Sequence, residues 1–375
     1  MKILSLFGTR PEAIKMAPII KALEEDSFFI SKICITAQHR QMLDQVLDLF
    51  ELIPDYDLDI MRKNQDLFDI TSKVLLGSRD VLEKERPDMI LVHGDTTTCF
   101  AATLAGFYSQ IPVGHIEAGL RTGNLRAPFP EEANRVMTTR LAQLHLAPTE
   151  EAQQNLLREN VAPENIAVTG NSVIDALLWV RKKVSTQHEW GEVFGSAKDI
   201  IHKQLPFILI TGHRRENFGQ GFLNICNAIS TLATHHPEIH FIYPVHLNPK
   251  VQQPIQSLLG NFTNIHLIKP LDYAPFVYAM DRCKLILTDS GGVQEEAPSL
   301  GKAVLVMRDI TERPEAVAAG TVILVGTNTD KIIAETERLL AAPEKQLSDI
   351  TQQNPYGDGK AAGRIIESLR QFSMR

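Results

Sequence analysis

Residues 288–315, TDSGGVQEEAPSLGKAVLVMRDITERPE, decide the fold of this chain. They continue an apolar run at 284–287 (KLIL) that has the character of a buried strand and that a Gly-Gly pair ends. A short helix start follows at 293–300, and a second apolar strand follows at 303–307. This order is typical of a parallel α/β sheet, in which the loops after successive strands emerge at the same edge.

The glycine turn in this stretch is a candidate anion site. Ser290, Gly291 and Gly292 stand where glycine lets backbone N–H groups approach an anion and the helix N-terminus adds roughly half a positive charge. Glu296, just beyond, can accept hydrogen bonds from sugar hydroxyls. Such turns are also ordinary connections in parallel sheets. Arg313 follows the next strand and favours the functional interpretation, because it emerges at the same edge.

Length, charge and cysteine usage narrow the class of protein. A chain of 375 residues with 44% hydrophobic content can bury the cores of two or three domains. A net charge of −7 without a Lys/Arg stripe argues against a nucleic acid or an anionic membrane as partner. The N-terminal apolar run ends too early for a signal peptide, and no apolar run reaches about 20 residues. We expect a cytoplasmic protein, because the isolated cysteines suit a reducing compartment: Cys34, Cys99, Cys226 and Cys283.

Short apolar runs alternate with longer segments of helical period along the chain. This alternation predicts βαβ units and an α/β fold of two Rossmann-like parallel-sheet domains, at 1–170 and 171–355. Residues 356–375 carry a C-terminal helix, for which packing back on the first domain is one of two options. The predicted strands are 3–7, 33–37, 89–93, 113–117, 144–148, 166–172, 207–211, 241–245, 265–268, 285–289, 303–307 and 321–325.

Polar side chains crowd the ends of these strands, where ligands bind in parallel sheets. Arg10 and Lys15 lie beside a helix start, and His213 follows a buried strand, so all three suit an anionic ligand. Two domains whose strand ends face each other would close a cleft around it. The loops concerned are GTRPEAIK (8–15), HGDTTT (93–98), the loop and helix start at 115–135, TGHRREN (211–217), YPVHLNP (243–249) and the stretch quoted first.

Carboxylates at strand ends of the first domain can act as general acids and bases, in a reaction where one group takes a proton and another gives it. Asp95, Glu117 and Glu131 are the candidates, although Asp95 and Glu131 also stand where helix caps are found. The pairs His93-x-Asp95 and His115-x-Glu117 can also bind a metal, which makes a metallohydrolase the alternative. The companion motifs of metallophosphatases are missing from the sequence, and we therefore predict no metal.

Taken together, HGDTTT, GHIEAGLRTG, PFPEEANR, TGHRREN, YPVHLNP and the TDSGGVQEEAPSLGK stretch resemble the non-hydrolysing UDP-N-acetylglucosamine 2-epimerases. The resemblance runs from GTRPEAIKMAP to NPYGDG. It implies a glycosyltransferase-B-like fold, two Rossmann-like domains facing a cleft, and a cytoplasmic homodimer. The implied reaction is reversible conversion of UDP-GlcNAc to UDP-ManNAc for surface polysaccharide synthesis. It proceeds by elimination of UDP to bound 2-acetamidoglucal and re-addition, so no redox cofactor is required.

Matching the family's motifs residue by residue implies a role for each candidate. The implied acid–base set is Asp95, Glu117 and Glu131, with His213 assisting at the diphosphate. The implied UDP-binding residues are Arg10, Lys15, Phe276 at the uracil, Ser290, Gly291, Gly292, Glu296 at the ribose, and Arg313. A second UDP-GlcNAc that acts as activator would bind Gln38, His39, Gln41, Arg214 and His246. The chain departs from the family's pattern at Asn64, where strongly regulated relatives carry arginine, and at Ala303 and Phe129, which look like packing changes.

Three other functions remain compatible with these residues. A hydrolysing relative would release free ManNAc and UDP. A retaining glycosyltransferase of the same fold would require an acceptor and yield a glycoside. A sugar-nucleotide sensor would bind UDP-GlcNAc without converting it, although a pure binder of an anion gains little from several carboxylates.

Overall fold

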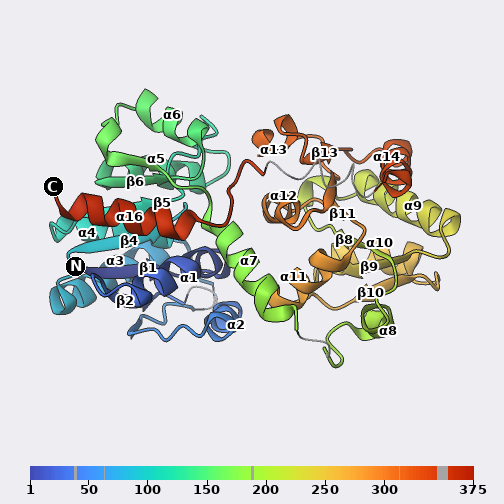
Figure 1. Ribbon diagram of the computed structural model, residues 1–375, viewed down its shortest axis with the longest axis horizontal. Helices are drawn as coiled ribbons and strands as arrows, with labels where there is room; N and C mark the ends of the chain where they lie inside the picture. Colours follow the sequence, from blue (N-terminus) through green and yellow to red (C-terminus); the bar gives the residue numbers. More distant parts are fainter. Residues whose placement is uncertain (38–39, 63, 187–189, 312, 344–353) are drawn as a thin grey trace. The chain divides into compact units, whose positions relative to one another are not determined.

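The computed structural model of the chain describes residues 1–37, 40–62, 64–186, 190–311, 313–343 and 354–375. It contains two compact units, one of Met1–Ala176 with Tyr356–Arg375 and one of Leu177–Pro355. We call them unit 1 and unit 2. Each unit has its own sheet and its own core (Figure 1).

Unit 1 is built on a seven-stranded sheet in the order β3-β2-β1-β4-β5-β6-β7. Every strand pair in it is parallel. The central strands are apolar on both faces because helices cover both sides, as parallel sheets require. The strands are β1 (Lys2–Phe7), β2 (Ile30–Ile35), β3 (Tyr56–Asp57), β4 (Met89–His93), β5 (Val113–Ile116), β6 (Leu144–Ala147) and β7 (Ile166–Val168).

The helices of unit 1 follow the strands in βαβ order. Helices α3 and α4 pack together, and their apolar residues share a buried cluster with β1 and β4. The C-terminal helix α16 lies along α1 (Figure 1), and Arg370 Nη2 binds Asp26 Oδ1 at 2.6 Å. The helices are α1 (Arg10–Glu25), α2 (Arg40–Phe50), α3 (Leu67–Glu85), α4 (Thr97–Tyr108), α5 (Glu131–Leu141), α6 (Glu150–Arg158), α7 (Ser172–Val184), which continues into unit 2, and α16 (Ala361–Ser373), with the 3₁₀ turn Pro163–Asn165.

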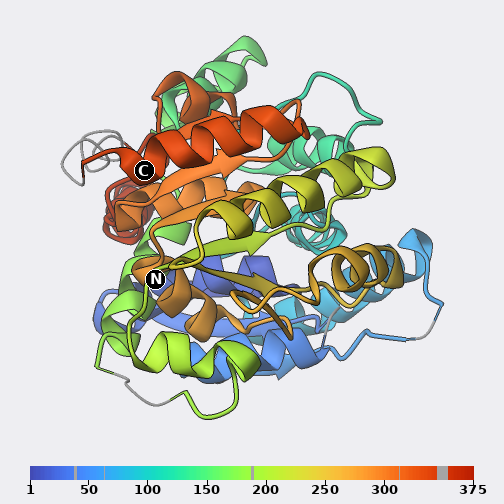
Figure 2. The same ribbon diagram turned by 90° about the vertical axis from the view of Figure 1, so that its right-hand side faces the viewer.

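Unit 2 repeats this plan with a six-stranded parallel sheet in the order β10-β9-β8-β11-β12-β13. Helices α9, α10 and α14 share one buried apolar cluster with this sheet, and α9 lies beside α14 (Figure 2). The strands are β8 (Phe207–Thr211), β9 (His240–Pro244), β10 (Ile265–Ile268), β11 (Leu285–Thr288), β12 (Ala303–Val306) and β13 (Val322–Leu324). The helices are α8 (Lys198–His202), α9 (Gln220–His235), α10 (Pro249–Leu259), α11 (Tyr273–Arg282), α12 (Gly291–Glu296), α13 (Pro314–Ala318) and α14 (Thr329–Ala341), with 3₁₀ turns at Gly195–Ala197, Arg215–Asn217 and Ala297–Leu300.

In each sheet the first strands are added towards one edge and the later strands towards the other. The strand order therefore reverses at one point, between β1 and β4 in unit 1 and between β8 and β11 in unit 2. The loops that leave the carboxyl ends of these strands diverge to opposite faces, and the space between them is the usual ligand site of such sheets. The predicted fold class, two Rossmann-like parallel-sheet domains, is confirmed.

Candidate active site

The switch point of unit 1 is organised by Glu12, whose side chain is buried. Its Oε2 accepts hydrogen bonds from the backbone N–H groups of Gly8 and Thr9, at 3.0 and 2.7 Å, and its Oε1 accepts one from Thr96 Oγ1 at 2.6 Å. Burial raises the pKa of Glu12, although these hydrogen bonds act to lower it. Glu12 thus joins the loop after β1 to the loop after β4. Glu12 was not among the predicted site residues, although Thr9-x-x-Glu12 has the spacing of a capping box, which the structure contains.

Glu117 lies directly after β5, and three side chains converge on it. Lys15 forms an ion pair with Glu117 Oε1, which also accepts a hydrogen bond from Asn171 Nδ2 at 2.9 Å. His93 Nε2 lies 3.8 Å from Oε2. The backbone of Glu117 is left-handed, with φ of 63°, a conformation that is uncommon outside glycine and that concentrates at functional sites. A predicted acid–base residue and a predicted UDP-binding residue, Lys15, are therefore direct neighbours.

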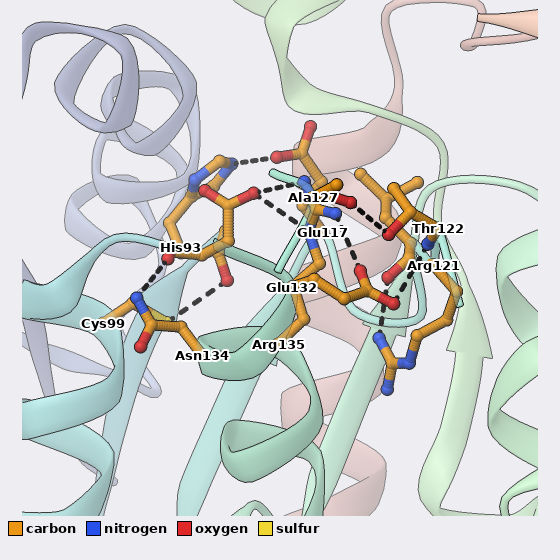
Figure 3. Close-up of polar contacts among 12 residues, drawn as sticks. His93, Cys99, Glu117, Arg121, Thr122, Ala127, Glu132, Asn134 and Arg135 are labelled. Carbon is orange, nitrogen blue, oxygen red and sulfur yellow. Dashed lines mark hydrogen bonds and ion pairs between the residues drawn. The ribbon is translucent and has the colours of Figure 1, made fainter. Parts of the chain in front are cut away.

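Asp95 lies in the loop after β4 and is held by Arg135 from α5. Figure 3 shows the Arg135 side chain next to that of Glu132. Arg135 Nε and Nη2 bind Asp95 Oδ2 at 2.9 and 2.6 Å, and its Nη1 binds Glu132 Oε2 at 3.0 Å. The other oxygen of Glu132 accepts the backbone N–H groups of Thr122 and Gly123, both at 3.0 Å. Glu132 is almost fully buried, so this network fixes the long loop between β5 and α5 as well as Asp95.

The helix-cap interpretation of Asp95 is wrong. The N-cap of α4 is the next residue, Thr96, whose Oγ1 accepts the N–H of Cys99 at 3.1 Å. Glu131 does lie in the first turn of α5, where the helix dipole favours a carboxylate. Its Oε2 is buried and has no hydrogen-bond partner among the described residues, which is unusual for a carboxylate oxygen.

The switch point of unit 2 gathers cations beside the glycine turn. His213 follows β8, and its ring stacks on that of His246 with 5.4 Å between centroids. Gly291 and Gly292 are the first two residues of α12, and no side chain caps this helix. A Cβ added to Gly291 would lie 3.8 Å from Nη2 of both Arg214 and Arg313. Two guanidinium groups therefore flank the start of α12, as an anion site at the glycine turn requires.

The other predicted UDP-binding residues of unit 2 lie near this turn in the chain. Glu296, at the end of α12, is buried and accepts a hydrogen bond from the Tyr273 hydroxyl. Arg313 forms an ion pair with Glu295, which is also buried. Phe276 is half-buried on α11. Neither Tyr273 nor Glu295 was among the predicted site residues, because nothing in the local sequence links either of them to its partner.

The predicted activator residues are only partly described. Gln38 and His39 lie outside the described residues. Gln41 is exposed on α2, Arg214 is half-buried, and His246 is exposed after β9. Arg10, a predicted UDP-binding residue, is the first residue of α1 and is half-buried.

Unit 1 keeps three buried histidines next to or within its sheet. Burial lowers the pKa of His93 to about 4, of His115 to about 3 and of His145 to about 4. Neutral His115 has its Nε2 2.7 Å from the carbonyl oxygen of Gly94. Within the described part of the chain, His, Cys, Asp and Glu side chains form no group of three or more that could hold a metal ion.

These histidines predict a loss of stability in mild acid. Their folded pKa values lie below the unfolded value of 6.5, so the unfolded chain binds more protons and the free energy of unfolding falls as pH drops from 6.5 towards 4. Each contributes roughly 2 kcal/mol between pH 7 and pH 5. The raised pKa of Glu12 acts in the opposite direction, because its stabilising effect grows below the raised pKa.

Denaturant unfolding at a series of pH values measures this effect. We expect the variant His145→Gln to show a shallower pH dependence than the wild type. The matched control is His202→Gln, at an exposed position on α8, which should leave the slope unchanged. Identical slopes for the wild type and His145→Gln would contradict the assignment.

The fold and these two switch points define the class of the protein, an α/β enzyme built on two Rossmann-like parallel sheets. Comparison with known proteins supplies the family: the model of the UDP-N-acetylglucosamine 2-epimerase family matches residues 21–370. The chain belongs to this family and is an isomerase of the epimerase type.

Individual relatives match the chain over almost its whole length. The UDP-N-acetylglucosamine 2-epimerase of Yersinia pestis is 58% identical and is covered completely, as is this chain. That of Escherichia coli K12 is 56% identical over 99% of this chain and 98% of its own length. The crystal structure of UDP-GlcNAc 2-epimerase from Neisseria meningitidis bound to UDP-GlcNAc is similar, with a TM-score of 0.88 and 54% identity over 99% of this chain and 100% of that one.

None of the helices in the described ranges is both long and apolar enough to cross a membrane.

Proposed function

We propose that this chain interconverts UDP-GlcNAc and UDP-ManNAc by inverting C2 of the sugar. Family membership supports the substrate, and the Neisseria relative was crystallised with UDP-GlcNAc. The observation that carries the proposal is Glu117, a carboxylate whose side chain is only 11% exposed, in a left-handed conformation, on which Lys15 and Asn171 converge. A carboxylate held this way at a strand end is preorganised for proton transfer.

The reaction requires an indirect route, because the proton on C2 is not next to a carbonyl and cannot be removed directly at a useful rate. We propose that a base takes the C2 proton while the C1–O bond breaks, so that UDP leaves and a C1–C2 double bond forms. The bound intermediate is 2-acetamidoglucal. Protonation of C2 from the opposite face and return of the UDP oxygen to C1 then give the epimer, with no net change in oxidation state.

We assign the proton transfers to the carboxylates of unit 1. Asp95, Glu117 and Glu131 form the set, in which one takes the proton from C2 and another returns one on the other face. Their surroundings differ: Asp95 is bound by Arg135, Glu117 is paired with Lys15, and Glu131 has a buried oxygen without a hydrogen-bond partner among the described residues. Such differences suit groups that must hold protons unequally.

We propose that the cations and the glycine turn of unit 2 bind the leaving group, UDP. Arg10 of unit 1 is a further UDP-binding residue in this proposal. His213, Arg313 and the first N–H groups of α12 would stabilise the negative charge that develops on UDP as it departs. Holding UDP also makes its return effectively intramolecular. In the same proposal Ser290 binds phosphate, Phe276 contacts the uracil, and Glu296 accepts hydrogen bonds from the ribose hydroxyls.

Product analysis tests this function. The purified chain is incubated with UDP-GlcNAc alone, and the sugar products are separated and identified by NMR. We expect a mixture of UDP-GlcNAc and UDP-ManNAc that is also reached from UDP-ManNAc. Accumulation of free ManNAc would identify a hydrolase instead, and calorimetric binding without any product would identify a sensor.

We further propose a cytoplasmic homodimer whose product feeds surface polysaccharide synthesis and that a second UDP-GlcNAc activates through Gln41, Arg214 and His246. The packed helices α3 and α4 support a dimer, because they expose Phe68, Leu76, Phe107 and Tyr108. Four buried cysteines without disulfides suit the cytoplasm. Sedimentation analysis measures the oligomeric state, and a monomer at micromolar concentration would contradict the dimer.

A further inference from the structure

Asp289 follows β11 and is completely buried. Its Oδ2 accepts hydrogen bonds from the backbone N–H groups of His213 and Arg214, at 2.8 and 2.7 Å, and a longer one from Asn217 Nδ2 at 3.4 Å. One oxygen of this carboxylate therefore holds the whole start of the loop after β8.

The sheet explains why these residues meet. Strands β8 and β11 are parallel neighbours, and their last residues, Thr211 and Thr288, are paired with 2.5 Å between their hydroxyl oxygens. The loops after both strands therefore leave at the same edge. Asn217 also donates a hydrogen bond to the carbonyl oxygen of Met307 at 3.1 Å, which fixes the loop to the segment after β12.

The second oxygen of Asp289 is not needed to hold the loop. Oδ1 is buried and has no hydrogen-bond partner among the described residues, a state that costs free energy for a carboxylate oxygen. It lies 3.6 Å from Nδ1 of His213, slightly beyond hydrogen-bond distance. The His213 side chain is 44% exposed, so the imidazole stands between this buried oxygen and the open side of the site.

We propose that Asp289 is a positioning residue for His213. It draws Nδ1–H towards Oδ1, so that Nε2 points outward, and it stabilises the imidazolium when negative charge develops on the leaving group. The second part rests on the proposed function, because it needs the departing diphosphate. The orientation of the ring does not depend on any substrate.

Charge around His213 shows why such a partner is required. Burial lowers the pKa of His213, Asp289 acts to raise it, and the neighbouring His246 and Arg214 lower it further. Of these charged neighbours only Asp289 favours the imidazolium form. Without Asp289, His213 would be a neutral ring beside the imidazole of His246 and the guanidinium of Arg214. Either of its two tautomers could then form.

The first experiment is ¹⁵N NMR of the full chain labelled at histidine. The signal of His213 is assigned among the 12 histidines by its absence in His213→Gln. In the neutral wild-type protein we expect the Nδ1–H tautomer, and in Asp289→Asn we expect that preference to be lost. An Nε2–H tautomer in the wild type would overturn the proposal, and this result needs no turnover and no folded variant other than His213→Gln, which supplies the assignment.

The second experiment is kinetic. We expect Asp289→Asn to lower kcat about 30-fold with a much smaller change in KM. In the His213→Gln background the same change should lower kcat less than about twofold, because a residue that acts through His213 has nothing left to position. Additive losses would overturn the proposal.

The matched control is Asn217→Ala, which loosens the same loop without removing the carboxylate. If Asp289 is only a loop anchor, both variants should lower kcat alike and leave the tautomer of His213 unchanged, and that outcome would also overturn the proposal. A wild-type chain that does not convert UDP-GlcNAc would instead refute the proposed function, while the NMR result would still decide the pairing of Asp289 with His213.

Discussion

Replacing Glu117 by glutamine is expected to lower kcat for epimerisation by about 1,000-fold. The amide keeps the shape of the side chain and can still accept a hydrogen bond from Asn171, but it cannot take or give a proton. The substitution also removes the ion pair with Lys15. Initial rates with UDP-GlcNAc measure the effect, and a thermal unfolding midpoint close to that of the wild type shows that the fold is retained.

Two sets of variants make this prediction specific. Glu150→Gln, at an exposed first-turn position of α6, is the matched control and should keep the wild-type rate. Asp95→Asn and Glu131→Gln should both lower kcat strongly. If all three site variants retain near-normal rates, the assignment of the proton chemistry to unit 1 is wrong.

Truncating Glu12 to alanine is expected to destabilise the protein by about 3 kcal/mol, because three donors lose their acceptor at once. These donors are the N–H groups of Gly8 and Thr9 and the hydroxyl of Thr96, which lie at the ends of the two central strands. Glu12→Gln should cost less than about 1 kcal/mol, since burial already favours the uncharged form of this side chain and the amide oxygen can accept from the same N–H groups. Denaturant unfolding at pH 7 compares the two variants.

The comparison separates a role of the acceptor from a role of the charge. Equal destabilisation by alanine and glutamine would mean that the negative charge itself holds the two loops together. Glu24→Ala, on the same helix but exposed, controls for the change in helix composition and should alter stability by less than about 0.5 kcal/mol.

The parallel sheets could be predicted because each central strand is a short apolar run that ends in polar or glycine residues. Strands β4, β8 and β10 have the predicted bounds, at 89–93, 207–211 and 265–268. Strand β3 was missed because it has only two residues and carries no pattern of its own. Its pairing depends on β2 beside it, which no local signal reveals.

The residues of the candidate site could be proposed from the sequence, but their contacts could not. Strand ends pointed to Asp95, Glu117 and His213, since polar side chains there are unusual beside apolar neighbours. The partners come from far along the chain: Arg135 is 40 residues from Asp95, Asn171 is 54 from Glu117, and Asp289 is 76 from the N–H of His213. Only the register of the sheets brings such pairs together.

Turnover in deuterated water tests the central claim most directly. UDP-GlcNAc is incubated with the chain in D₂O until the two epimers reach equilibrium, and hydrogen at C2 is measured by ¹H NMR and mass spectrometry. Elimination and re-addition predict that UDP-ManNAc forms with deuterium at C2, and that recovered UDP-GlcNAc gains deuterium at the same carbon. UDP-ManNAc that retains its original hydrogen at C2 would contradict the account.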